Sequence, residues 1–128
     1  MPRFVILRHD MPPGTPRASH YDLMLEQDSV LRTWACDALP QADSPTLADP
    51  LPDHRLAYLT YEGEVSGDRG SVTRVATGEY ELLQETSQLV RVRLSSDTIR
   101  GVLVLARGDG EQAYRWRVSL DPVAPSSA

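Results

Sequence analysis

The sequence lacks the features that would place it outside the ordinary globular proteins. Its 128 residues include one cysteine, Cys36, so the chain can form no internal disulfide and gives no sign of an oxidising compartment. No apolar run is long enough for a membrane helix, and Phe4–Leu7 is too short for a secretory signal. We therefore expect a cytoplasmic protein with no membrane association.

Lysine is absent altogether. All 13 basic residues are arginines, and 18 acidic residues bring the formal net charge to -5. This balance argues against a basic face for broad wrapping of a nucleic-acid backbone, although it is compatible with contact to one strand end. Arginine's planar fork suits phosphate recognition, but a lysine-free composition equally fits a GC-rich genome.

Composition and patterning predict one mainly β domain. Hydrophobic residues make up 41% and charged residues 24% of the chain, which is enough for one packed core. Short strand-like segments between turn-rich sequences predict a small antiparallel β-barrel of about eight strands, with at most short helical turns. We expect the domain to span residues 1–121 and a disordered tail to span residues 122–128. The expected strands are Phe4–Arg8, a half-buried Tyr21–Glu26, Val30–Cys36, Ser71–Ala76, Glu79–Glu85, Leu89–Leu94, Ile99–Ala106 and Tyr114–Leu120.

Proline, glycine and acidic residues mark the expected connections. Asp37–Asp53 contains four prolines and is predicted to be a long surface loop without regular structure. His54–Tyr61 fits either a short strand or a helical turn, and in both cases His54 and Tyr58 are neighbours. Turns are expected at Gly67–Gly70, Thr77–Gly78 and Gly108–Gly110.

Two histidines and one aspartate near the first predicted hairpin indicate a divalent-metal site. His20 and Asp22 are separated by one residue, so on a strand both side chains project from the same surface. His9 ends the preceding strand and can supply a third ligand if the two strands are neighbours. Two imidazoles and one carboxylate suit manganese, iron or zinc, and they leave coordination positions open for water or substrate.

The same residues also have structural interpretations that involve no metal. Histidines near a strand pair are commonly surface or hydrogen-bonded residues. Asp10 fits a turn or capping residue, and Glu26 fits a solvated strand residue better than a fourth ligand. Trp34 and Trp116 are expected to pack in the core, with Cys36 as a small buried residue. Spacing alone leaves both interpretations open.

Five motifs together resemble a known family: Phe4–Asp10, His20–Glu26, Leu31–Ala35, Asp53–Tyr58 and Tyr61–Gly63. In order, residue type and approximate spacing they resemble the 3′-phosphoesterase domain of bacterial DNA ligase D, and the resemblance covers most of the chain. It implies a β-barrel enzyme that uses manganese to remove a terminal ribonucleoside and then a 3′-phosphate from DNA ends. We take zinc and cobalt as the alternative metals.

Carried over by position, the resemblance implies that His9, His20 and Asp22 are metal ligands and that His54 and Tyr58 are further active-site residues. The ion would hold a phosphate oxygen and activate a water. His54, as imidazolium, would hydrogen-bond the phosphate or protonate the leaving oxygen, and Tyr58 would orient it.

Four positions depart from the family's pattern. The family has an arginine two residues after the aspartate, where this chain has Met24, and a thioether cannot grip phosphate as a guanidinium does. Where the family has a glutamine two residues before the first histidine, this chain has Leu7. The family's lysine aligns near Ala38, and a further arginine aligns near Thr46. Arg17, the only basic residue of the first loop, is predicted to restore one cationic contact.

Two functions are predicted from these features. The first is a stand-alone metal-dependent phosphoesterase acting on a DNA 3′ end or on a smaller phosphate ester, and the acidic balance favours the smaller or a different substrate. The second is a catalytically inactive metal-binding barrel that serves as a nucleic-acid or protein interaction module. A third interpretation makes the histidines ordinary surface residues.

Overall fold

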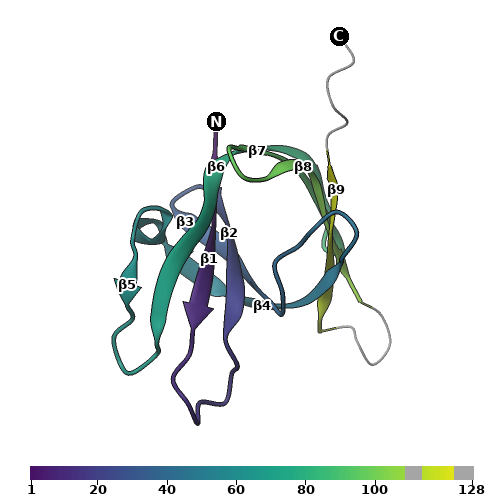
Figure 1. Ribbon diagram of the computed structural model, residues 1–128. Coiled ribbons are helices and arrows are strands. Elements are labelled where there is room, and N and C mark those ends of the chain that lie inside the picture. Colours follow the sequence, from purple (N-terminus) through teal and green to yellow (C-terminus); the bar gives the residue numbers. More distant parts are fainter. Residues whose placement is uncertain (109–113, 123–128) are drawn as a thin grey trace.

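Strands make up most of the part of the chain that the structure describes. The structure, a computed structural model, describes residues 1–108 and 114–122 (Figure 1). No helix in these two ranges is long and apolar enough to span a membrane. The elements are β1 Arg3–Asp10, β2 His20–Gln27, β3 Val30–Cys36, β4 Thr46–Arg55, the 3-10 turn η1 Leu56–Leu59, β5 Gly63–Glu64, β6 Ser71–Glu85, β7 Leu89–Ser96, β8 Arg100–Arg107 and β9 Trp116–Pro122.

Eight of these strands close an antiparallel barrel, as predicted. Neighbours follow the order β1-β2-β3-β4-β9-β8-β7-β6, and β6 pairs with β1 to complete the ring. The two-residue strand β5 pairs with the start of β6 and lies outside the ring (Figure 1). Because β1 and β2 sit between β6 and β3, side chains on their outer face have neighbours on both sides.

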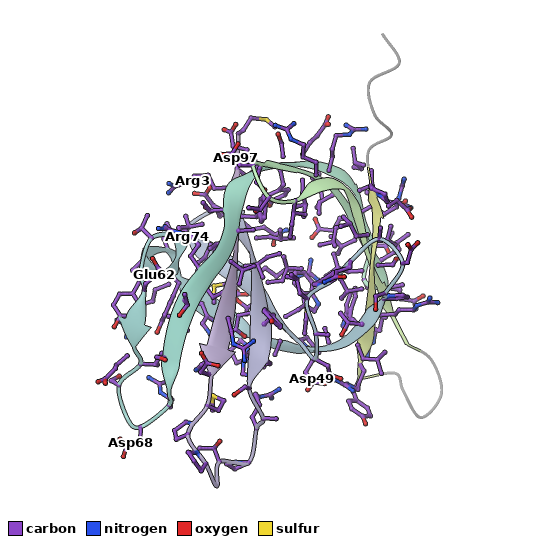
Figure 2. The ribbon with its side chains drawn as sticks, in the orientation of Figure 1. Arg3, Asp49, Glu62, Asp68, Arg74 and Asp97 are labelled. Atoms are coloured by element: carbon purple, nitrogen blue, oxygen red, sulfur yellow. The ribbon has the colours of Figure 1, made fainter. Side chains whose placement is uncertain are left out.

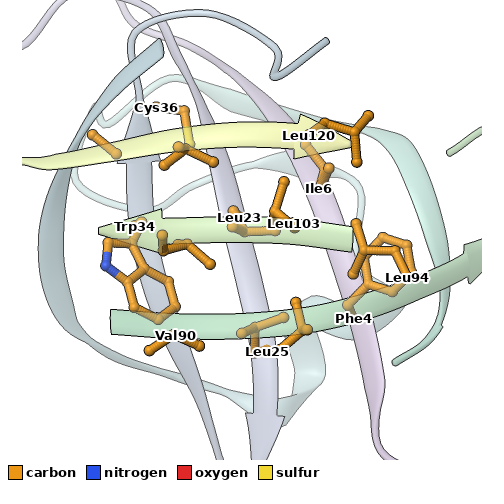
Figure 3. Packing of buried hydrophobic residues seen from close by; sticks show 14 of the residues in the cluster. Phe4, Ile6, Leu23, Leu25, Trp34, Cys36, Val90, Leu94, Leu103 and Leu120 are labelled. Atoms are coloured by element: carbon orange, nitrogen blue, oxygen red, sulfur yellow. The ribbon is translucent and has the colours of Figure 1, made fainter. Parts of the chain in front are cut away.

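The inside of the barrel is filled by side chains from all eight strands (Figure 3). Phe4 of β1 and Leu23 of β2 are fully buried there. Trp34 and Trp116 meet edge to face, with ring centroids 5.8 Å apart, which confirms their predicted place in the core. Cys36 is buried beside them, and burial raises the pKa of its thiol to about 12, so it is an inert packing residue.

A second apolar cluster covers the outer face of β1 and β2. The turn η1 supplies Leu59 to it, and Val65 packs at its edge, so the segment between β4 and β6 lies over this face. Strand β2 is therefore buried on both faces, and the prediction that it is half buried was wrong because nothing local indicates this cover. The buried members are Val5, Leu7, Met24, Leu31, Leu59 and Val72.

The predicted loop Asp37–Asp53 is wrong over its second half, because β4 begins at Thr46. Prolines at 50 and 52 suggested irregular structure, yet both lie within this strand. β4 pairs with β9 only over Thr46–Ala48, so within the described residues its second edge is open beyond that point. A proline there interrupts no ladder on that edge, which is where sheets tolerate it.

The predicted turn at Thr77–Gly78 is also wrong, because β6 runs through it without interruption. At Gly78 the strand changes partner from β1 to β7. A Cβ atom on Gly78 would lie 2.2 Å from the carbonyl oxygen of Ser95, so glycine permits the close approach of two strands at a barrel corner.

The remaining predicted connections have mixed outcomes. His54–Tyr61 is the end of β4 followed by η1, so both proposed structures occur in sequence. Gly67–Gly70 is a turn, with positive φ angles at Gly67, Asp68 and Gly70. The turn predicted at Gly108–Gly110 and the tail predicted from residue 122 fall mainly on residues 109–113 and 123–128, which lie outside the described part, and Pro122 itself ends β9.

Candidate metal centre

The β1–β2 register places the predicted ligands side by side on the outer face of the barrel. His9 is directly opposite His20, and Leu7 is directly opposite Asp22. Residues that face each other across an antiparallel pair share a face, and this face carries the outer apolar cluster rather than the barrel core. The two histidines and Asp22 therefore meet on one surface, as the spacing predicted.

The three side chains are close enough to share one ion. His9 Nδ1 lies 3.1 Å from Asp22 Oδ2, and His20 Nε2 lies 3.0 Å from Asp22 Oδ1. One ligand atom from each residue lies within 4.8 Å of the others. Their burial is high, with 3% of the Asp22 side chain and 6% of the His20 side chain exposed. Only His9 retains a moderate exposure.

Backbone carbonyls hold the other nitrogen of each imidazole. His9 Nε2 lies 2.6 Å from the carbonyl oxygen of Arg69, and His20 Nδ1 lies 2.8 Å from that of Ala18. A carbonyl oxygen only accepts, so these nitrogens must donate. In a neutral imidazole the opposite nitrogen then carries the lone pair, and in both histidines that nitrogen faces Asp22. Metal-ligating histidines are typically fixed in this way.

This arrangement fits a cation. Lone pairs on two imidazoles point at a carboxylate, and the repulsion is removed only by a proton or a metal ion between them. The His20 contact to Asp22 Oδ1 is short but poorly aligned, so Oδ1 is buried with no hydrogen bond from any described residue. One shared divalent ion would satisfy both nitrogens and both carboxylate oxygens together.

The ionisation of the site is consistent with such a role. Burial alone would raise the pKa of Asp22, but the contacts with His20 and His9 outweigh it and lower this pKa to about 2. The contact with Asp22 raises the pKa of His9. Asp22 is therefore a carboxylate throughout the neutral range, as a metal ligand must be.

A cavity of about 630 Å³ opens beside the triad and brings in the other predicted active-site residues. His9 and Asp22 line one side of it, and His54 and Tyr58 line it as well. The rings of His54 and Tyr58 meet edge to face at 5.7 Å, which confirms that they are neighbours. His54 Nδ1 donates to the carbonyl oxygen of Pro52 at 2.9 Å, so Nε2 is its remaining nitrogen.

Arg17 lies on the opposite flank of the triad. Its Nη1 donates to Asp49 Oδ2 at 3.1 Å, and it borders a second hollow that also contains His20. Arg115 binds the same carboxylate and that of Asp37, at 2.8 and 2.9 Å. Asp49 marks this flank in Figure 2. The structure thus does not bring Arg17 to the cavity that holds His54 and Tyr58.

Three of the four departures from the family's pattern are buried in the packing, and Ala38 is exposed. Leu7 and Met24 are each 1% exposed and belong to the outer apolar cluster, with Met24 at the cavity wall. Thr46 is buried, and its hydroxyl accepts a hydrogen bond from the backbone of Ala38 at 3.0 Å. None of these positions supplies a cation.

Asp10 and Glu26, the acidic residues near the triad, make contacts with arginines instead. Asp10 accepts a hydrogen bond from the Arg8 guanidinium at 2.9 Å. Glu26 accepts one from the backbone of Arg3 at 2.8 Å. Neither belongs to the group of ligand atoms formed by the triad.

Sequence reasoning missed two arginines that line the cavity, Arg55 and Arg69. Arg55 precedes η1, and Arg69 lies in the turn before β6. The Gly67–Gly70 turn itself was predicted, but no role was assigned to Arg69. The glycines and positive φ angles of the turn were the available signal, because such turns allow backbone to approach closely.

Comparison with known proteins identifies the family of the chain. A family model described as the DNA ligase D 3′-phosphoesterase domain matches residues 9–107. The multifunctional non-homologous end joining protein LigD of Mycobacterium bovis is 34% identical over 123 residues, which cover 88% of this chain and 15% of the relative. The multifunctional non-homologous end joining DNA repair protein LigD of Mycobacterium tuberculosis has the same identity and coverage. The chain thus spans about 15% of the length of these curated relatives.

Proposed function

The chain belongs to the family of the DNA ligase D 3′-phosphoesterase domain, and from this membership and its histidine–aspartate triad we propose that it is a metal-dependent phosphoesterase. Its substrate would be a phosphate ester, either at the 3′ end of DNA or in a smaller molecule. The observation that supports this most is the convergence of two imidazole nitrogens on the buried Asp22 carboxylate, whose Oδ1 lacks a hydrogen bond from any described residue.

His9, His20 and Asp22 would hold the ion, with manganese proposed first and zinc or cobalt as alternatives. A bound divalent ion supplies Lewis-acid polarisation of the phosphate and a nucleophilic water. The carbonyls of Ala18 and Arg69 keep both imidazoles in the tautomer that binds a cation.

His54 and Tyr58 would act on the other side of the bound ester. Because the His54 Nδ1 proton is held by Pro52, Nε2 is free to donate, as imidazolium, to a phosphate or leaving oxygen. Tyr58 packs between the rings of His54 and Tyr61, at 5.7 and 5.8 Å. Its hydroxyl makes no hydrogen bond within residues 1–108 and 114–122, which leaves it available to orient the same oxygen.

The cavity favours a small ester over a long nucleic-acid strand. Much of its lining is apolar, including Met24, Leu51, Val65 and Val72. With a net charge of -5, the chain offers little long-range attraction to a polyanion. A nucleotide-sized or aromatic ester fits these observations better than an extended strand.

A substrate panel tests the proposal. Protein loaded separately with manganese, zinc or cobalt is incubated with 3′-phosphate and 3′-ribonucleotide DNA primers and with bis(p-nitrophenyl) phosphate. We expect turnover in at least one metal, and its loss in Asp22→Asn but not in the matched variant Asp10→Asn. No turnover of any substrate by protein with verified metal content would refute the proposal.

The buried apolar residues at the family's phosphate-binding positions favour a second candidate function. Met24 and Leu7 are packed in the outer cluster and give no polar contact. A barrel that keeps the ion site but does not catalyse would serve as a nucleic-acid or protein interaction module. Metal binding together with saturable oligonucleotide binding and no turnover would favour this function over the first.

A further inference from the structure

We infer that Arg69 is the phosphate-binding cation of this site, in place of the arginine that the family has at the position of Met24. The inference rests on the proposed function, because it assumes an anionic ester beside the triad. It assigns a substrate contact to the turn before β6.

The cation must come from a wall of the cavity other than β2. Met24 is 1% exposed and packs with Leu59 and Val72, so no cation stands at its position. Arg17 is paired with Asp49 on the opposite flank. Within the described residues, the arginines that line the cavity are Arg55 and Arg69.

The backbone of Arg69 is fixed to the metal centre. Its carbonyl oxygen accepts the His9 Nε2 proton at 2.6 Å, although 60 residues separate the two in sequence. The next residue, Gly70, has a φ of 81°, and a Cβ atom there would lie 1.9 Å from the carbonyl oxygen of Asp10. Glycine therefore lets the turn press against the end of β1 and hold Arg69 beside the triad. Figure 2 shows the turn, labelled at Asp68, beside β1.

The guanidinium of Arg69 is oriented by neutral acceptors. Nε donates to the carbonyl oxygen of Ser66 at 2.7 Å, and Nη2 donates to the Ser66 hydroxyl at 3.3 Å. Both acceptors are neutral. Asp53 and Glu64 also line the cavity, but among the described residues no carboxylate forms an ion pair with Arg69. Donors on the guanidinium remain for an anion.

Arg55 is the weaker candidate in the same cavity. Its side chain makes no hydrogen bond or ion pair in the described part of the chain, so nothing orients it. A fixed cation loses less conformational entropy on binding an anion than a free one does. The geometry thus favours Arg69 as the main contact.

Calorimetric titration of manganese-loaded protein with inorganic phosphate tests the inference. We expect Arg69→Gln to weaken phosphate binding by about tenfold or more, and Arg69→Lys to recover part of it, because lysine keeps the charge but not the fork. Manganese affinity should stay within about twofold, since the contact to His9 comes from the backbone. Arg55→Gln, Arg17→Gln and the distant Arg100→Gln are the matched controls.

Each outcome decides the inference. Wild-type phosphate affinity in Arg69→Gln, or a larger loss in Arg55→Gln or Arg17→Gln, overturns it while leaving the proposed function intact if ester turnover persists. Wild-type protein that binds manganese but neither phosphate nor esters overturns both. In the turnover assay, Arg69→Gln should raise KM more than it lowers kcat, whereas a misfolded variant would lose manganese binding as well.

Discussion

The two flanks of the triad contain the same kinds of charged residue but use them differently. On the flank next to β3 and β4, Arg17 and Arg115 are neutralised by Asp37 and Asp49. On the flank next to β6, the acceptors that Arg69 finds within the described part of the chain are the neutral oxygens of Ser66.

The difference shows that an arginine's position in sequence says little about its availability to a ligand. Arg17 is nearer to the triad in sequence, yet its guanidinium forms an ion pair with Asp49. Arg69 is remote in sequence and retains its charge at the cavity. Ligand-binding capacity is thus decided by the partners of each cation.

The largest effect should come from removing the carboxylate at the centre of the triad. Asp22→Asn takes away the charge that both histidines face, so manganese affinity should fall by about 100-fold or more. Isothermal titration of the variant measures this, with thermal unfolding to confirm that the barrel persists. Asp10→Asn, which disrupts an exposed pair with Arg8 and removes no ligand of the triad, should bind manganese like the wild type. Unchanged affinity in Asp22→Asn would remove the triad as the ion site.

Changing a residue of the cavity that Arg69 lines should affect catalysis rather than ion binding. His54→Gln can keep a donor to Pro52 but cannot transfer a proton, so kcat should fall by about 100-fold or more. Steady-state kinetics at verified metal content measures it. Tyr58→Phe keeps both ring contacts and should cost less. A His54→Gln variant with wild-type kcat would limit this residue to packing.

Gly70, in the turn that carries Arg69, can be compared with Gly14, in the loop between β1 and β2. Gly70→Ala places a Cβ atom against the Asp10 carbonyl, so the turn must shift and phosphate affinity should fall by several-fold, about 1 kcal/mol. Gly14→Ala has a similar positive φ but nothing within 4 Å, and its effect should be limited to backbone strain. Equal phosphate affinity in both variants would separate the turn from the site.

Local patterns predicted the parts of this molecule that local physics decides. Alternation placed His20 and Asp22 on one face, and the chain order made His9 their neighbour. The barrel was predicted for the same reason, because short apolar segments and turns repeat along the chain. The family resemblance added His54 and Tyr58, which the structure brings to the same cavity.

The errors concern features that depend on distant partners. Prolines in β4 suggested a loop because sequence does not reveal that the strand's second edge is open there. Gly78 suggested a turn because the close approach of Ser95 comes from another strand. Arg69 escaped notice for the same reason, since its contact with His9 spans 60 residues.

The smallest effect should follow from releasing the cations of the β3–β4 flank. Asp49→Asn removes the carboxylate that Arg17 and Arg115 share, and loss of such partly exposed pairs should lower the free energy of unfolding by about 1 kcal/mol. Phosphate affinity should change by less than about twofold, because Arg17 borders the other hollow. Glu62→Gln, which breaks the exposed pair with Arg74, is the matched control for stability. A clear gain in phosphate affinity in Asp49→Asn would mean that a freed Arg17 reaches the bound anion. In that case the ion pair with Asp49, rather than the position of Arg17, prevents this arginine from binding phosphate in the wild type.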